Sequence, residues 1–272
     1  MNSIATNRAA IRVHYHGINN SKIESQAFTR LASGQRVNNA SDDAAGLFIA
    51  GRMKAQITGL ERAVHNSFDG VSLVNTAEAN LNEIRNMVLR MREIAVQMAN
   101  GIYLDNPDRD FAQIEIDQLM QQIDIIAENA TFNGVKLLDG SMQNVGIQTG
   151  PTANERPSIF FKDNTTSGLS VDTVSVTTQA NAKAAMVTLE TALTSISDEL
   201  SRAGAYENRF DHTISVLEKT AKATKISRGR IMDADIAAES TRLSKSQVLS
   251  QANTAMLAQA NQSMGHLLTL FN

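Results

Sequence analysis

The side chains in this sequence that could do chemistry include two close pairs of aspartates. Asp42 is adjacent to Asp43, and Asp233 is two residues before Asp235. Carboxylates at such short spacing are a common part of Mg²⁺ and Ca²⁺ sites. Both pairs lie where a helix is expected to begin, however, and the helix dipole favours negative charge there. Helix starts explain both pairs, so we predict no metal site.

The five histidines offer little metal-binding or catalytic chemistry. His14 and His16 are two residues apart, so on a helix they point to different faces. No two histidines are four residues apart, which the His-Glu-x-x-His zinc peptidase motif requires. The sequence also has no Gly-x-x-x-x-Gly-Lys phosphate loop, no Gly-x-Ser-x-Gly nucleophile elbow and no cysteine. We therefore expect a protein that is not an enzyme and uses no cofactor.

The composition is unusual for a globular protein of 272 residues. Aromatic residues make up 4%, tryptophan is absent and there are 3 prolines, whereas hydrophobic residues reach 42%. Compact cores normally rely on large aromatic side chains. This composition therefore favours long helices packed side by side.

Charge and hydropathy exclude two kinds of partner. The net charge is −3 and there is no basic stripe, which argues against nucleic acid. No run of about 18 apolar residues predicts a membrane span. The first residues lack the apolar core of a secretory signal, which by itself predicts the cytoplasm. An export route that uses no cleaved signal stays open.

The longest helical pattern covers residues 44–100. At about 1.5 Å per residue, such a helix reaches on the order of 80 Å, too long to bury its face in a small globule. The pattern therefore implies an elongated helical bundle. Its apolar residues alternate steps of three and four, the spacing of a helix seam: Val74, Ala77, Leu81, Ile84, Val88, Met91, Ala95 and Met98.

Two more helices are expected at residues 107–129 and 180–226. Pro107 fits the first helical position, where its missing N–H costs nothing. The first of these helices is expected to run antiparallel to the long one, with these side chains inward: Phe111, Ile114, Leu119, Ile123 and Ile126. Between them, residues 135–178 carry short alternating runs that predict two or three strands.

The two terminal segments look incomplete alone. In residues 4–33, Ile11 and Ile18 are seven residues apart, a coiled-coil period, but the apolar surface is too small for a stable single helix. Near the other end, an apolar stripe at helical spacing includes Leu249, Met256, Ala260 and Leu267, and ends beyond Leu270. An exposed apolar stripe implies a partner surface. We expect the two terminal helices to pair.

A joint connects the first helix to the long one. Gly34 is expected to end the first helix, and Asn38 to Ser41 form a turn cluster. Ser41 can cap the next helix, with Asp42 and Asp43 in its first turn.

The amino-acid sequence of this joint resembles the N-terminal signature of bacterial flagellins. In that family the segment is the spoke between an inner coiled-coil domain and an outer helical domain. The matching spoke positions are Gly34, Arg36, Asn38, Asp42 and Asp43. Four further segments resemble the same family in the same order: Leu89–Gln97, Thr131–Leu138, Gly204–Phe210 and Ser227–Asp235 with the helix that follows.

The resemblance implies a mainly α fold: an elongated antiparallel helical bundle and coiled coil with a small β-hairpin region. It implies five segments: 1–43 and 228–272 as the two halves of the inner domain and spokes, and 44–134, 135–179 and 180–227 as the outer domain. In the family the terminal helices pair as a coiled coil. The matching positions are Ile11, Ile18, Leu31, Leu249, Met256, Ala260, Leu267 and Leu270.

The resemblance also implies a surface on the outer domain. In flagellins this face packs between neighbouring subunits and binds Toll-like receptor 5, which makes that receptor a candidate partner. The matching positions are Arg90, Arg92, Ile94 and Glu115.

The function implied is that of a structural subunit that polymerises into the flagellar filament for swimming motility. Its partners are then copies of itself, an export chaperone, the type III export apparatus, and cap and junction proteins. The expected location is the external filament, although Asn100–Tyr103 resembles spirochaete flagellins, whose filaments stay in the periplasm. A hook–filament junction protein and a secreted coiled-coil effector remain the alternatives.

Overall fold

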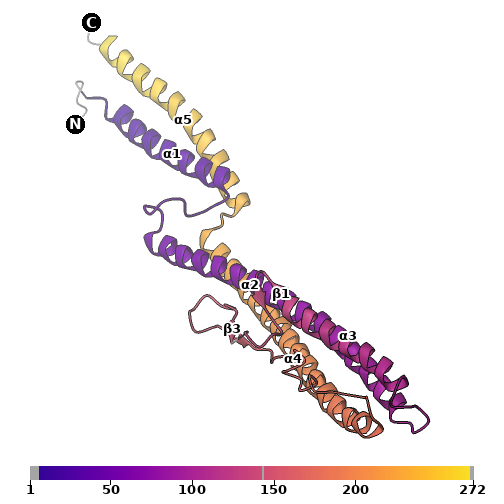
Figure 1. Ribbon diagram of the computed structural model, residues 1–272. Helices are drawn as coiled ribbons and strands as arrows, with labels where there is room; N and C mark the ends of the chain where they lie inside the picture. The colour runs from indigo at the N-terminus through magenta and orange to yellow at the C-terminus, as the bar shows by residue number, and fades with distance from the viewer. Residues whose placement is uncertain (1–5, 143, 270–272) are drawn as a thin grey trace. The chain divides into compact units, whose positions relative to one another are not determined.

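The computed structural model describes the backbone of residues 6–142 and 144–269 and the side chains of residues 6–142 and 144–265 (Figure 1). The described part contains five helices and two pairs of short strands, so the mainly α class is confirmed. The chain divides into two compact units. One comprises Met1–Ile57 with Lys222–Asn272, and the other comprises Thr58–Ala221.

The second unit is built on the helices α2 (Ala44–Met98), α3 (Asp108–Asn129) and α4 (Gln179–Met232), the first and last of which continue into the other unit. The seam predicted on α2 is confirmed, because every one of its residues from Val74 to Met98 is at most 4% exposed. These side chains share one apolar core with the inner faces of α3 and α4.

The inner face predicted for α3 is confirmed in its later part and wrong at its start. Ile123 is fully buried, and Leu119 and Ile126 pack against the core, as predicted. Phe111 and Ile114 were also expected inward, but they are 68% and 57% exposed, and Arg109 and Ile116 are buried in their place. Arg109 sets this face at the start of α3, because its guanidinium is drawn inward by carbonyls of the preceding turn.

The Arg109 guanidinium donates to the carbonyl oxygens of Met98 at 3.0 Å, Asn100 at 2.9 Å and Tyr103 at 2.7 Å. It also contacts the Asp105 carboxylate. The last carbonyls of a helix have no partner within that helix. Arg109 therefore caps the end of α2 and joins it to α3.

The strands form two separate antiparallel pairs. β1 (Thr131–Phe132) pairs with β2 (Val135–Lys136), and β3 (Val145–Gly146) pairs with β4 (Ser158–Ile159). The first pair is a two-residue hairpin in which Asn133 and Gly134 have φ of 48° and 79°. Positive φ at both turn residues is what an Asn-Gly hairpin turn requires, so the hairpin expected from the family resemblance is present.

The two or three strands predicted over residues 135–178 are present as β2, β3 and β4, but residues 160–178, which include the apolar Val174 and Val176, contain no strand. Side chains of α3 take the place of a neighbouring strand. The Val176 N–H donates to Gln113 Oε1 at 2.7 Å, and the Thr166 N–H donates to Asp124 Oδ1 at 2.8 Å. The segment can therefore bury Val174 and Val176 without a backbone ladder.

The first unit contains α1 (Arg8–Ser33) and α5 (Ile236–Thr269), which lie side by side (Figure 1). The predicted pairing of the terminal helices is therefore present. The side chains on α1 that are not exposed again alternate steps of about three and four: Ala10, Val13, Gly17, Asn20, Glu24, Ala27, Arg30 and Leu31. Those on α5 are Glu239, Leu243, Ser246, Asn253, Leu257, Ala260 and Met264.

This seam differs from the one predicted. Ile11 and Ile18 are 45% and 54% exposed, and Leu249 and Met256 are 44% and 57% exposed. Of the other expected positions, Leu31 is half-buried and Ala260 is 9% exposed. The Leu267 side chain and Leu270 lie outside the described residues. The α1 sequence carries two overlapping heptad phases, and the phase with small and polar side chains faces α5.

The start of α2 also differs from expectation. The Gly46 N–H donates to Asp43 Oδ1 at 2.8 Å, and the Leu47 N–H donates to the Asp43 carbonyl at 3.0 Å. Asp43, not Ser41, therefore caps α2. The helix begins at Ala44, which places Asp43 immediately before it, in the position from which a carboxylate reaches the first free N–H groups.

The α3 face can be tested by alanine substitution on one helix. Ile123 is fully buried, so Ile123→Ala should lower the free energy of unfolding by about 2–5 kcal/mol. Phe111→Ala, on the same helix, should change it by less than about 0.5 kcal/mol. Denaturant unfolding of the full chain measures both values. An equally large loss for Phe111→Ala would contradict the orientation of α3.

The cap of α2 gives a second test. Asp43→Ala should lower stability by about 1 kcal/mol, because it leaves N–H groups at the helix start without an acceptor. Ser41→Ala is the matched control and should change stability little. Amide hydrogen exchange measures local opening at residues 44–48, and the exchange rate should rise for Asp43→Ala but not for Ser41→Ala. Faster exchange for Ser41→Ala alone would show that Ser41, and not Asp43, caps the helix.

Candidate functional site

The first candidate site is the pair of linkers that join the terminal helices to α2 and α4. Gly34 ends α1 with φ of 67°, a left-handed conformation that glycine adopts without strain. Gln35 then forms an antiparallel bridge with Asp233. The Arg36 N–H donates to the Met232 carbonyl at 2.6 Å, and the Ala234 N–H donates to the Gly34 carbonyl at 3.0 Å. The two linkers are therefore joined by backbone hydrogen bonds.

Arg36 joins the linker to the end of α4 a second time. Its Nη2 donates to the Ile231 carbonyl at 2.7 Å. The last carbonyls of α4 thus find donors on the other linker, which explains why α4 continues to Met232. The helix predicted over residues 180–226 therefore ends later than expected, at Met232, and only residues 233–235 separate α4 from α5.

Asp42 and Asn38 fold the longer linker. Asp42 Oδ2 accepts hydrogen bonds from the N–H groups of Asn38 and Asn39, both at 3.1 Å. These two bonds, that from Asn38 first, lower the pKa of the Asp42 carboxyl group because they stabilise its charged form. The Asn38 side chain donates to the Gln35 carbonyl at 3.0 Å. The predicted spoke positions therefore lie together, and Asp43 adds the cap of α2.

A small apolar cluster lies beneath the linkers. Val37 and Ala50 are each 2% exposed and Met232 is 5% exposed. Leu47 and Ile231 pack against them. The first linker, the start of α2 and the end of α4 therefore share one core, which holds the paired linkers in place.

The second candidate site is the surface of α2 and α3 near Arg90. Arg90 Nη2 and Nε lie 2.8 and 2.9 Å from Glu115 Oε1, and Nη1 lies 3.3 Å from Glu93 Oε2. The side chains of Arg90 and Glu115 are 52% and 47% exposed. Ile94, expected at this surface, is 3% exposed and belongs to the core. Ile94 lies one turn after Met91 and next to Ala95, on the buried face of α2, which explains the difference.

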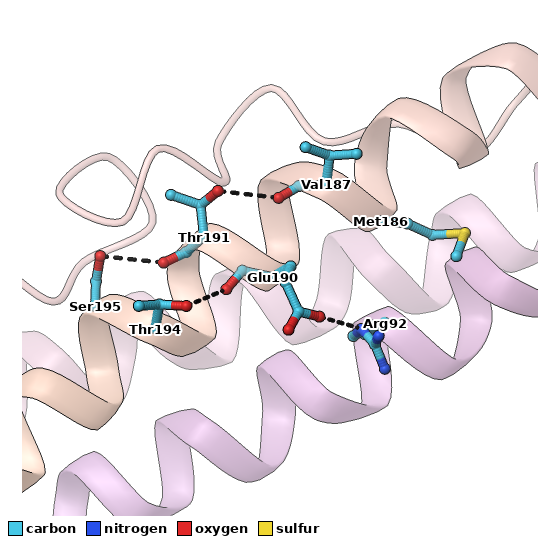
Figure 2. A pocket seen from close by; sticks show the side chains of 7 residues that line it. All are labelled: Arg92, Met186, Val187, Glu190, Thr191, Thr194 and Ser195. Atoms are coloured by element: carbon cyan, nitrogen blue, oxygen red, sulfur yellow. Dashed lines mark hydrogen bonds and ion pairs between the residues drawn. The ribbon is translucent and has the colours of Figure 1, made fainter.

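Arg92 belongs to another surface. Its Nε lies 2.9 Å from Glu190 Oε2, so it connects α2 with α4 rather than with α3. Figure 2 shows this pair at the edge of a shallow hollow of about 560 Å³ that Met186 and Val187 also line. Thr191, Thr194 and Ser195 in the hollow donate to carbonyls of α4 itself, at 3.0, 3.0 and 3.2 Å. The four predicted surface residues therefore separate: Arg90 and Glu115 together, Arg92 apart and Ile94 buried.

The third candidate site is the exposed outer face of the terminal helix pair. Besides Ile11 and Ile18, Tyr15 on α1 is 65% exposed, and Val248 on α5 is 65% exposed. Tyr15 and Asn20 were not predicted as contact residues from the sequence. The sequence of α1 does contain a 3–4 repeat that indicates the inner face: Ala10, Val13, Gly17 and Asn20. The larger side chains of Ile11 and Ile18 favoured the other heptad phase.

Within the part of the chain that the structure describes, no group of three or more His, Cys, Asp or Glu side chains could hold a metal ion. No described helix is long and apolar enough to cross a membrane.

Comparison with known families matches both halves of the chain. Residues 4–143 match the bacterial flagellin N-terminal helical region, and residues 186–271 match the bacterial flagellin C-terminal helical region. The flagellin of Halalkalibacterium halodurans is 38% identical over 241 residues, covering 87% of this chain and 88% of the relative. The flagellar filament core protein flaB2 of Brachyspira hyodysenteriae is 37% identical over 252 residues, with the same shares of the two chains.

A solved structure agrees with these matches. The crystal structure of Bacillus cereus flagellin is 32% identical in sequence, with a TM-score of 0.50, and the match covers 56% of this chain and 88% of that one. None of these matches supports the junction-protein or effector alternatives. The chain belongs to the bacterial flagellin family.

Proposed function

We propose that this filament subunit polymerises through the outer face of its terminal helix pair. The observation that carries the proposal is the exposure of Ile11, Tyr15 and Ile18 on α1 and of Leu249 and Met256 on α5. Large apolar side chains gathered on one helix pair mark an interaction surface. Copies of the same chain are the partners of a flagellin, so neighbouring subunits are the proposed cover.

The energetics support assembly through this face. Burial of apolar surface stabilises an association by about 25 cal/mol for each Å² removed from water. The seam between α1 and α5 contains small and polar side chains such as Gly17, Asn20 and Ser246, whereas burial of the exposed isoleucines would add apolar area. The terminal helices are thus expected to gain most of their stability in the polymer, as in coupled folding and binding.

The Arg90 surface is the second proposed contact between subunits. Leu89, Phe111 and Ile114 are 41%, 68% and 57% exposed and lie next to, or within one helical turn of, the Arg90–Glu115 pair in sequence. We propose that a neighbouring subunit covers these side chains. Toll-like receptor 5 is a further proposed partner of this surface, through the exposed Arg90 and Glu115 and not through the buried Ile94.

The linkers support a division of the chain into an inner and an outer part. We propose residues 1–43 and 228–272 as the inner, polymer-forming part and residues 44–134, 135–179 and 180–227 as the outer part. The hydrogen bonds from Arg36 to the end of α4 would then fix how each terminal helix leaves the outer part.

Export and location follow from the family rather than from a site. We propose that the chain passes unfolded through the type III export apparatus, with a chaperone on α5, and assembles under a cap beyond a junction protein. The absence of cysteine fits an unfolded, uncrosslinked passage. The external filament is the proposed location, and antibody labelling of filaments on unpermeabilised cells tests it against the periplasm.

Electron microscopy of the purified chain in sulfate tests the proposed assembly, since sulfate strengthens apolar burial. The full chain should form long tubes, and a chain without residues 1–30 and 240–272 should stay monomeric. Monomers from both, even with filament seeds, would contradict polymerisation through the termini.

A surface variant tests the outer face itself. Ile11→Ser/Ile18→Ser should raise the concentration needed for polymerisation about tenfold or more, because two apolar side chains lose their burial. Arg12→Ser/Asn19→Ser is the matched control, one residue along on exposed positions, and should polymerise nearly as the parent does. Pelleting of polymer across a concentration series gives the value. Equal values for the two double variants would refute the proposed face.

A further inference from the structure

The turn between α2 and α3 begins with an exposed Asn-Gly pair, Asn100–Gly101. The peptide nitrogen that follows an asparagine can attack the amide carbon of the asparagine side chain and close a succinimide ring. Glycine favours this reaction because it has no side chain to hinder the approach. The chain contains the pair twice, here and at Asn133–Gly134, so only the surroundings of each pair can distinguish them.

Arg109 provides the first contact that favours the reaction at Asn100. Its Nη2 donates to the Asn100 carbonyl oxygen at 2.9 Å, and this carbonyl belongs to the same peptide group as the Gly101 nitrogen. A cation on the carbonyl oxygen stabilises the negative charge that the peptide group gains when its nitrogen loses a proton. The Arg109 side chain is 3% exposed, so water screens its charge little, whereas its ion-pair partner Asp105 is 66% exposed.

The second contact is made to the amide that would be attacked. The Ile102 N–H donates to Asn100 Oδ1 at 3.3 Å, which folds the side chain back along the chain past Gly101. This N–H lies where negative charge develops on Oδ1 during the attack, as the donors of an oxyanion hole do. Among the described residues, the Gly101 N–H has no hydrogen-bond acceptor, and Gly101 is exposed. Hydroxide from the solvent can therefore remove its proton.

The second Asn-Gly pair has neither contact. Asn133 and Gly134 have φ of 48° and 79° and connect two paired strands, which restrict their backbone. Within the described part of the chain, no guanidinium donates to the Asn133 carbonyl and no N–H donates to its side-chain amide. The hairpin is therefore an internal control with the same dipeptide.

We infer that Asn100–Gly101 is a self-modification site at which the chain converts Asn100 to an isoaspartyl residue, with Arg109 as the activating group. The Gly101 nitrogen gives its proton to hydroxide and forms a bond to Asn100 Cγ. The bond between Cγ and Nδ2 then breaks, and ammonia leaves after taking a proton from water. Water finally opens the ring at one of its two carbonyl carbons, so the sequence of steps needs no oxidant or reductant.

Arg109 also selects the product. In the ring, the former main-chain carbonyl of Asn100 stays beside the guanidinium, so it is the more polarised of the two carbonyls. Addition of water to this carbon breaks its bond to the Gly101 nitrogen and leaves Cγ as the link in the main chain. The carboxylate that forms lies against Arg109, where charge-assisted hydrogen bonds stabilise it. The expected product is therefore isoaspartate rather than aspartate, and the main chain gains one methylene.

Incubation of the purified full chain at neutral pH tests the inference. Peptide mass spectrometry with electron-transfer fragmentation follows the conversion of Asn100 and Asn133 and distinguishes isoaspartate from aspartate. In the folded chain Asn100 should react about tenfold or more faster than Asn133, the effect of one hydrogen bond to a charged group. In urea both pairs lose their surroundings, so the two rates should become equal. Equal rates in the folded chain, or a slower reaction of Asn100 in the folded chain than in urea, would overturn the inference.

Two variants separate activation by Arg109 from its structural role. Arg109→Gln removes the charge and should lower the rate at Asn100 about tenfold, with the isoaspartate share falling to its value in urea. Arg109→Lys keeps the charge and should retain part of both effects. If Arg109 only holds the turn, Arg109→Gln loosens it and the rate at Asn100 rises, which would contradict the proposal, as would an unchanged isoaspartate share. Circular dichroism shows whether each variant folds, and if Arg109→Gln does not, the comparison of the folded parent with the parent in urea decides.

Discussion

The structure of the first unit depends on a seam between α1 and α5 that is made of small and polar side chains. Ala10, Gly17 and Ala27 supply close packing but little apolar area, and Asn20 and Glu239 are buried polar side chains in the seam. Several large apolar residues, among them Ile11, Ile18 and Met256, are exposed on the other side of the helices. A weak seam and a strongly apolar outer face are two results of one choice of heptad phase.

The linkers hold the base of the helix pair in a defined geometry. Gly34 ends α1, and the N–H of Arg36 then donates a hydrogen bond to the Met232 carbonyl at the end of α4. The first linker therefore completes a helix that belongs to the far end of the sequence. Two segments separated by about 200 residues become one joint, so α1 cannot be placed independently of α4 within this unit.

The sequence predicted the elements better than their orientation. The α2 seam and the Asn133–Gly134 hairpin were predictable because each has one dominant signal, a single 3–4 repeat or a turn that needs positive φ. On α1 two apolar phases compete, and size favoured the wrong one, whereas on α3 the prediction failed only near the helix start, at Phe111 and Ile114. On α3 the deciding residue is Arg109, whose burial follows from carbonyls that a periodicity argument does not include. The linker pairing was also hidden, because backbone hydrogen bonds leave no pattern in the side chains.

The two units differ in the size of their apolar cores. In the second unit Leu81, Ile84 and Met91 are fully buried within the chain, although Phe111 and Ile114 stay exposed on its surface. In the first unit Ile18 and Met256 are more than half exposed, and the proposed assembly would cover them with a neighbouring subunit. A subunit of this kind would remain separate at low concentration, because the contacts that bury these side chains form only between copies. The same exposed residues would then supply the driving force for the polymer.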